Sequence, residues 1–277
     1  MKYISLFVLL LTCSLVFSQS EVDSFYVKTQ YNHVLNNGMM TYKKLPVNQK
    51  TYNKQGQLVR EVVYTPGEIT IDYELYYHYD NNKNYLIEKY IDYKLVHYWL
   101  LKYKKDKLKQ KTAFSYSNGK SILVGKTKYS DKKGLSSIKE YSPEKELIYS
   151  YTLNKKNSLH HIAEENFQES DSIERRIKHE YYNKKWDAPE RTMEIIYSKT
   201  GIDTIKTENK INLKGRVDES VATNSTNTKI TTRYTYFPKG EIKKFYSINE
   251  KRKYTKYVEY DLKKYYRDIP LLGPTVK

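Results

Sequence analysis

Short runs along this chain alternate between apolar and polar residues with a period of two. In residues 69–79, Tyr73 and Tyr77 fall on one side and Glu74 falls on the other. Successive side chains of a strand leave opposite faces, so the pattern predicts a half-buried β-strand. Residues 85–95 alternate in the same way and predict another strand. No long stretch repeats with the helical period of 3.6.

Polar clusters rich in Asn, Lys and Gly separate these runs, roughly every 12 to 15 residues. Asn and Gly tolerate the positive φ angles that tight turns require. The pattern therefore predicts an all-β protein, an antiparallel meander of repeated β-hairpins that form one long twisted or curved sheet.

Two regions interrupt the pattern. Residues 158–178 fit either a helix or a strand pair that turns at residues 169–172, and the polar turn favours the hairpin. Residues 218–229 are rich in Thr, Ser and Asn, and we expect a long mobile connection there, around Asn224.

The turns share a sequence frame. A ring ends one strand, a flexible residue makes the turn, and an aliphatic side chain is buried at the start of the next strand. Two full copies are Tyr52-x-x-x-Gly56-x-Leu58 and Tyr236-x-x-x-Gly240-x-Ile242. Two partial copies are Ile211-x-x-x-Gly215-x-Val217 and Tyr197-x-x-x-Gly201. Several degenerate copies indicate an internal repeat.

This frame resembles the Tyr-Gly repeats of the YD/RHS family and of related MORN-type repeat proteins exported by Gram-negative bacteria. Tyr79-Asp80 and Tyr260-Asp261 also match the Tyr-Asp dipeptide of that family. The resemblance covers most of residues 50–262. It implies antiparallel hairpins laid side by side in a twisted sheet.

Composition sharpens this picture. The chain has 277 residues, 31 Tyr, a mean hydropathy of −0.81 and a formal net charge of +17. Such polarity is typical of disordered chains, but those lack aromatic and β-branched residues. We therefore expect an ordered protein whose sheet surfaces are covered by Tyr, whose ring is apolar and whose hydroxyl can remain in water.

The N-terminus predicts export. A basic residue, an apolar run and short residues before position 18 are typical of a signal peptide cleaved after Ser18. Residues 19–50 are expected to be a lead-in with one or two strands, 51–266 the repeat domain, and 267–277 an irregular tail. The predicted location is periplasmic, on the cell surface or secreted. Lipid attachment at Cys13 is the disfavoured alternative.

Catalytic motifs are missing from the sequence. Loss of Cys13, the one cysteine, would exclude disulfides, thiolate zinc sites and a cysteine nucleophile from the mature chain. His160, His161, Glu164 and Glu165 resemble a metal site only on a helix, since a strand sends neighbours to opposite faces. We predict no catalytic residue, no metal, no cofactor and no enzymatic activity.

Cations interleaved with rings are the strongest functional signal. The candidate binding residues, each of which core packing could also explain, are Tyr73, Tyr77, Trp99, Tyr234, Tyr236, Lys243 and Lys244. Such surfaces can hold anionic polymers or stack on sugars. Export disfavours nucleic acid. The alternative explanation is that Lys at sheet edges prevents strand pairing between molecules.

The resulting hypothesis is an exported, non-enzymatic binding or scaffold protein. Its predicted partner is an acidic envelope polymer, a glycan or another exported protein. A polysaccharide-active enzyme on a β scaffold and an antitoxin-like or immunity protein are the alternatives. An outer-membrane barrel would need a continuous lipid-facing apolar band. The alternating runs lack one, so we expect no membrane-spanning segment once the signal peptide is removed.

Overall fold

The structure is a computed structural model, and it describes residues 25–132, 135–156, 161–169, 172–181, 188–198 and 201–265. These residues form a single antiparallel sheet of 18 strands. The strands are β1 (Phe25–Asn36), β2 (Met39–Tyr52), β3 (Leu58–Tyr64), β4 (Ile71–Asp80), β5 (Lys83–Ile91), β6 (Lys94–Lys104), β7 (Lys107–Ser117), β8 (Lys120–Lys132), β9 (Leu135–Tyr141), β10 (Leu147–Lys156), β11 (His161–Glu169), β12 (Ser172–Glu180), β13 (Arg191–Ser198), β14 (Gly201–Ile211), β15 (Val217–Thr223), β16 (Lys229–Tyr236), β17 (Ile242–Asn249) and β18 (Tyr254–Tyr265).

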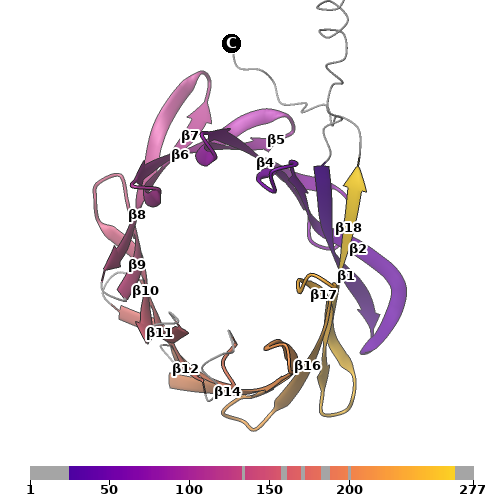
Figure 1. Ribbon diagram of the computed structural model, residues 1–277. Helices are drawn as coiled ribbons and strands as arrows, with labels where there is room; N and C mark the ends of the chain where they lie inside the picture. Colours follow the sequence, from indigo (N-terminus) through magenta and orange to yellow (C-terminus); the bar gives the residue numbers. More distant parts are fainter. Residues whose placement is uncertain are drawn as a thin grey trace, which may run out of the picture.

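The sheet closes into an up-and-down β-barrel. Each strand pairs with its neighbour in the chain, and β1 also pairs with β18 from Phe25↔Tyr265 to Asn32↔Val258 (Figure 1). The antiparallel meander is therefore confirmed, and the open sheet is wrong. Closure gives the ladder groups of the two terminal strands a partner, which an open sheet would leave exposed. Strands β1 and β2, expected as a lead-in, belong to the same sheet.

The predicted signal peptide and the predicted C-terminal tail lie outside the described residues. Within the described residues, no helix is long and apolar enough to span a membrane.

The inner face of the wall can be assigned from one turn. The turn between β16 and β17 curls into the ring (Figure 1), and its Glu241 carboxylate lies 3.6 Å from the Lys28 ammonium of β1. Gly240 to Ile242 and Lys28 line one cavity together, although β17 and β1 are two strands apart in the sheet. A contact between strands that are two apart requires the barrel wall to curve toward the side on which the Lys28 side chain lies. Lys28 therefore points into the barrel, and the pairing registers assign the other positions.

The turn frame has a common geometry at one end of the barrel. Tyr52 pairs directly with Leu58, and Tyr236 pairs with Ile242, so the ring and the aliphatic side chain meet across the turn. Ile211 and Val217 pair in the same way. The turn glycines Gly56, Gly215 and Gly240 have φ of 77°, 75° and 101°, a region that disfavours side chains. Their amides each donate to the carbonyl three residues back at 2.9 Å.

Tyrosine hydroxyls donate hydrogen bonds to backbone carbonyls of neighbouring strands at this end of the barrel. Tyr79 donates to the Leu58 carbonyl at 3.0 Å, and Tyr236 donates to the Val217 carbonyl. The Tyr197 copy differs from the others. It lies at the opposite end of the barrel and on the outer face, and Gly201 is the first residue of β14, where it pairs with Ser198 of β13.

Three local expectations have clear outcomes. Strands β11 and β12 confirm the hairpin for residues 161–169 and 172–178, whereas residues 158–160 and 170–171 lie outside the described part. Residues 85–95 are not one strand, because Asp92 and Tyr93 adopt positive φ and turn the chain between β5 and β6. The long connection around Asn224 is also wrong. Residues 217–223 form β15, and only a short turn precedes β16, with the Asn224 side chain accepting from the Thr228 amide at 2.8 Å.

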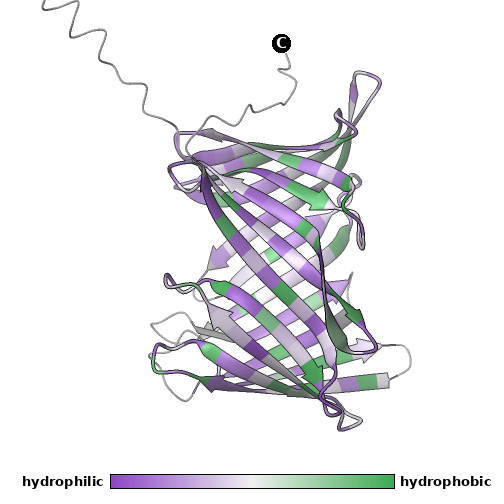
Figure 2. Cartoon of the chain, turned by 90° about the vertical axis from the view of Figure 1, so that its right-hand side faces the viewer, coloured by the Kyte–Doolittle hydropathy of each residue, from purple (hydrophilic) through white to green (hydrophobic). Residues whose placement is uncertain are grey.

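The barrel has little dry interior. Among the described residues, the buried apolar side chains are Val27, Val62, Tyr76, Tyr90 and Val258. They lie within the wall, where neighbouring side chains cover them. On the side that Figure 2 shows, hydrophobic and hydrophilic positions are interspersed along the strands and form no continuous hydrophobic belt.

Candidate functional site

The inner face carries a cavity where the barrel closes. This inner pocket has a volume of about 510 Å³ and is lined by Lys28, Gln30, Asn48, Lys50, Tyr52, Gly240, Glu241, Ile242 and Tyr260. Strands β1, β2 and β18 form its floor, and the turn before β17 covers one side. Antiparallel pairing places these floor residues side by side because their registers coincide, as in Tyr26↔Tyr52 and Gln30↔Tyr260.

Two lysines stand directly opposite each other on the pocket floor. Lys28 pairs with Lys50 across β1 and β2. Each ammonium has one carboxylate, Glu241 at 3.6 Å from Lys28 and Glu61 at 3.4 Å from Lys50. Like charges opposite each other in a ladder destabilise it unless they are compensated. The carboxylates provide this compensation at the edges of the pocket.

The inner surface around the pocket is basic. Its strands β17, β18, β1 and β2 form what we call the closing wall. The inner lysines of this wall are Lys28, Lys50, Lys256 and Lys264. Within the described residues, no Asp or Glu of these four strands points inward, because Glu259 and Asp261 alternate to the outside. Acidic compensation comes from the turn and from β3.

Two tyrosines frame the pocket. Burial, followed by the nearby carboxylates of Glu241 and Glu61, raises the pKa of Tyr52. Burial also raises the pKa of Tyr260. Both hydroxyls therefore stay protonated at neutral pH and can donate hydrogen bonds. The Lys28 ammonium lies 5.2 Å from the centre of the Tyr260 ring, which is within cation–π range.

The pocket therefore combines aromatic faces, amide groups and cations. Rings can pack against the C–H faces of a sugar, and Gln30 and Asn48 offer both donors and acceptors for hydroxyl groups. The lysines suit carboxylate or sulfate substituents. This combination favours recognition of a polar, anionic ligand.

The sequence-predicted binding residues mostly face inward but do not meet. Tyr73 and Tyr77 lie on β4, Trp99 on β6, and Tyr234 and Tyr236 on β16, all on the inner face.

Lys244 instead points outward opposite Glu259, and Lys243 lies at a bulge at the start of β17. The structure spreads these residues around the barrel rather than bringing them into one site.

Local partners occupy several of the inward rings. The Tyr77 hydroxyl donates to Glu61 at 3.1 Å, and burial and the Glu61 charge raise the pKa of Tyr77. The Lys89 ammonium lies 3.9 Å from the centre of the Tyr73 ring. Trp99 lies 5.8 Å from the Lys111 ammonium. These cations and rings form pairs along the inner wall.

Sequence reasoning missed most of the inner pocket. Lys28, Gln30, Asn48 and Lys50 lie in the segment assigned to the lead-in, and Tyr260 lies at the other end of the sheet. Closure of the barrel brings Tyr260 of β18 beside these residues of β1 and β2. The sequence does show side chains of residues 26, 28 and 30 on one face of a predicted strand. This pattern predicts the strand but not the strand with which it pairs.

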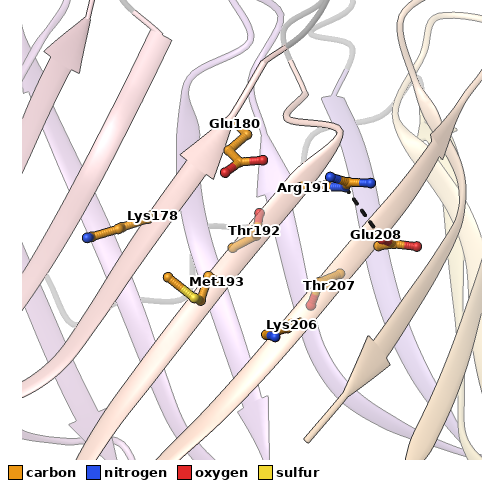
Figure 3. A pocket seen from close by; sticks show the side chains of 8 residues that line it. All are labelled: Lys178, Glu180, Arg191, Thr192, Met193, Lys206, Thr207 and Glu208. Atoms are coloured by element: carbon orange, nitrogen blue, oxygen red, sulfur yellow. Dashed lines mark ion pairs between the residues drawn. The ribbon is translucent and has the colours of Figure 1, made fainter.

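A smaller hollow lies on the outer face of β12, β13 and β14, with a volume of about 380 Å³ (Figure 3). It contains Lys178, Met193 and Lys206, and an ion pair of 3.4 Å between Arg191 and Glu208. Its charges alternate in sign, so it lacks the uniform character of the inner pocket.

The strand geometry does not bring the two glutamates of the suggested metal cluster together. Glu164 and Glu165 lie on opposite faces of β11, paired with Arg176 and His179 respectively. His160 and the His161 side chain lie outside the described part. Among the described residues, no group of three or more His, Cys, Asp or Glu is placed to hold a metal ion.

Comparison with known proteins gives a likeness in fold. No family model and no curated protein matches the chain. A porin-like protein from Bacteroides uniformis is 9% identical, with a TM-score of 0.44 over 86% of this chain and 97% of that one. A porin-like protein from Bacteroides vulgatus is 6% identical, with a TM-score of 0.33 over 87% and 98%.

A chain of the TcdB2–TccC3–Cdc42 complex is 10% identical, with a TM-score of 0.32 over 76% of this chain and 15% of that one.

Proposed function

We propose that this protein is an exported, non-enzymatic barrel that binds acidic glycan chains on its inner wall. The observation that carries the proposal is the inner pocket, where two opposed lysines, two tyrosines and two amide side chains share one cavity. The wider closing wall adds Lys256 and Lys264 to the same surface.

The character of the outer face supports an aqueous location. A barrel that spans a membrane needs an outward apolar band about 25 Å tall. Here the outer face carries ion pairs in the middle of its strands, such as Arg60 with Glu74, Arg176 with Glu164 and Arg233 with Glu219. An arginine or lysine at the bilayer midplane costs about 2–4 kcal/mol. The barrel is therefore proposed to work in water after export.

An acidic glycan fits the inner wall better than a neutral one. The inner side chains of the closing wall bring four lysines and no carboxylate of their own. The negative charge of a uronic acid or sulfated sugar would complement this excess of lysines. Its ring would lie on Tyr52 or Tyr260, and its hydroxyls would reach Gln30 and Asn48.

Calorimetric titration tests the proposal. The chain without its predicted leader is titrated with polygalacturonate and with neutral dextran. We expect polygalacturonate to bind and its affinity to fall steeply with salt, because screening weakens contacts between exposed charges. Dextran should bind weakly or not at all.

A matched pair of variants locates the site. Lys28→Gln with Lys50→Gln removes two inner charges, whereas Lys178→Gln with Lys206→Gln removes two outer ones. Only the inner pair should weaken polygalacturonate binding. Equal loss in both variants would show that binding follows net charge and would refute the inner site.

A further inference from the structure

The outer face of strands β6 to β10, which we call the lysine wall, carries a row of cations. The register aligns Lys102, Gln110, Lys128 and Lys139 across four neighbouring strands. Lys126 lies in the adjacent row, opposite Thr112. Lys102, Lys128 and Lys139 are exposed.

These lysines are uncompensated within the described structure. Lys128 pairs directly with Lys139 in the ladder, which places like charges opposite each other. Among the described residues, none of the four lysines forms an ion pair, and no carboxylate lies on the outer face of β6 to β10. The one recorded partner is the Tyr141 ring, whose centre lies 4.8 Å from the Lys128 ammonium.

The rest of the outer face is different. On β11 to β16, Arg176 pairs with Glu164, Arg191 with Glu208, and Arg233 with Glu219. On β11 to β16, carboxylates thus lie among the outward cations, whereas the described outer face of the lysine wall carries none. A surface that keeps like charges together without carboxylates is suited to an external anion.

An exposed apolar strip adjoins the lysines. Leu100 and Val124 expose 45% and 44% of their surface. Beside them, the rings of Tyr98 and Phe114 stack with their centres 4.9 Å apart. Along β6, the outer face therefore changes from Tyr98 and Leu100 to Lys102 within a few residues.

We propose that the lysine wall docks on an anionic phospholipid surface. A basic row beside exposed aliphatic and aromatic side chains is the arrangement that peripheral membrane-binding surfaces use. The lysines would contact the phosphate groups, and Leu100, Val124 and the Tyr98–Phe114 pair would enter the interface. A soluble polyanion would use the lysines but would leave this apolar strip in water. An anionic lipid surface would therefore contact both the lysines and the apolar strip.

Vesicle co-sedimentation tests the proposal with the chain lacking its predicted leader. Vesicles of phosphatidylcholine are compared with vesicles that also contain phosphatidylglycerol. We expect binding to the anionic vesicles only. Removal of three lysines in Lys102→Gln, Lys128→Gln and Lys139→Gln should weaken it about a hundredfold, since each lysine near an anionic surface contributes about fivefold.

Two further variants separate the possible outcomes. Lys178→Gln, Lys206→Gln and Lys244→Gln remove the same charge from other outer strands and should leave binding nearly unchanged. Leu100→Ser with Val124→Ser should weaken vesicle binding about tenfold while leaving retention on heparin unchanged. Circular dichroism verifies the fold of each variant.

Three results would overturn the proposal. They are absence of binding to anionic vesicles, equal loss in both lysine triples, and no effect of the Leu100 and Val124 changes. The last result, with heparin still bound, would identify a polyanion site instead. Because the inner lysines are untouched in these variants, polygalacturonate titration reports separately on the glycan proposal.

Discussion

Two regions of the outer face differ sharply although they are built from the same antiparallel ladder. On β1 to β5, the covered wall, outward side chains are buried by their neighbours. They include Val27, Thr29, Thr51, Val62, Glu74, Tyr76 and Tyr90. On the lysine wall of β6 to β10, outward Leu100, Val124 and Lys128 stay exposed.

Side-chain length and pairing explain the difference. In the covered wall, Arg60 reaches Glu74, the Tyr76 hydroxyl donates to the same carboxylate at 3.2 Å, and the Tyr76 and Tyr90 rings meet edge to face at 5.4 Å. Long side chains thus lie along the sheet and cover shorter ones. In the lysine wall, cations face cations and extend into solvent. A polar outer face can therefore be either closed on itself or open to a partner.

The largest expected effect comes from a charge in the covered wall. Val62 is 3% exposed, so Val62→Asp should reduce the free energy of unfolding by more than about 4 kcal/mol or prevent folding. Leu100→Asp in the lysine wall should change it by about 0.5 kcal/mol or less. Denaturant unfolding measures both. Similar losses would erase the distinction between the walls.

Removal of one buried charge partner comes next. Arg60→Ala leaves the Glu74 carboxylate, whose side chain is 9% exposed, without its guanidinium, and should cost about 3–5 kcal/mol. Arg233→Ala breaks a pair in which both side chains are partly exposed, so the loss of unfolding free energy should be much smaller. Thermal unfolding of both variants at one pH tests the contrast.

A backbone change should act equally in both walls. Gly56 and Gly119 have φ of 77° and 74°, and a Cβ at either position would meet nothing within 4 Å. Substitution by Ala should therefore cost about 1–2 kcal/mol at each site, from left-handed strain alone. Chemical denaturation gives the values. If only Gly56→Ala lowered the free energy of unfolding, the two walls would respond differently to the same backbone strain, and the prediction would be wrong.

The ionisation of Tyr90 gives a spectroscopic contrast. Burial, and then the Glu88 charge and hydrogen bond, raise the pKa of Tyr90 to about 12. Tyr90→Phe should remove one late-ionising phenol from an ultraviolet pH titration and cost about 0.5–1.5 kcal/mol in stability. Tyr42→Phe, at a fully exposed ring, is the matched control for the stability measurement.

The smallest effect is expected at the barrel seam. The His33 hydrogen bond at 3.0 Å, together with Lys44, lowers the pKa of Glu259 below its ordinary value. A carboxyl with a lowered folded pKa stabilises the protein above its unfolded pKa. It loses that contribution as pH falls below about 4. Glu259→Gln should therefore flatten the acid side of a stability-against-pH curve. An unchanged slope would contradict this coupling.

The sequence predicted the strands better than their closure. Alternation in residues 71–80 depends on neighbouring positions, so Tyr73, Tyr77 and Glu74 fall on the expected faces. Pairing of β1 with β18 depends on residues more than 200 positions apart, and no local pattern encodes it. The turn at Asp92 and Tyr93 was missed because a tyrosine with positive φ is an unusual turn residue.

The candidate site depended on this closure. Tyr52 and Tyr260 each follow the repeat frame or its Tyr-Asp variant, but their proximity required the ring to close. The lysine row could have been recognised only with the exact registers of β6 to β9. Alternation leaves the register open, because a slip of two positions keeps every side chain on the same face.

The seam also makes the chain's connectivity interchangeable. Phe25 and Tyr265 are ladder partners, so the first and last described strands meet like any other neighbours. A linker joining these ends, with the chain reopened at the Asn118–Gly119 turn, would relocate the termini without removing a single strand pairing. Because β1 and β18 pair like any other neighbouring strands, a circular permutant should still form the same barrel.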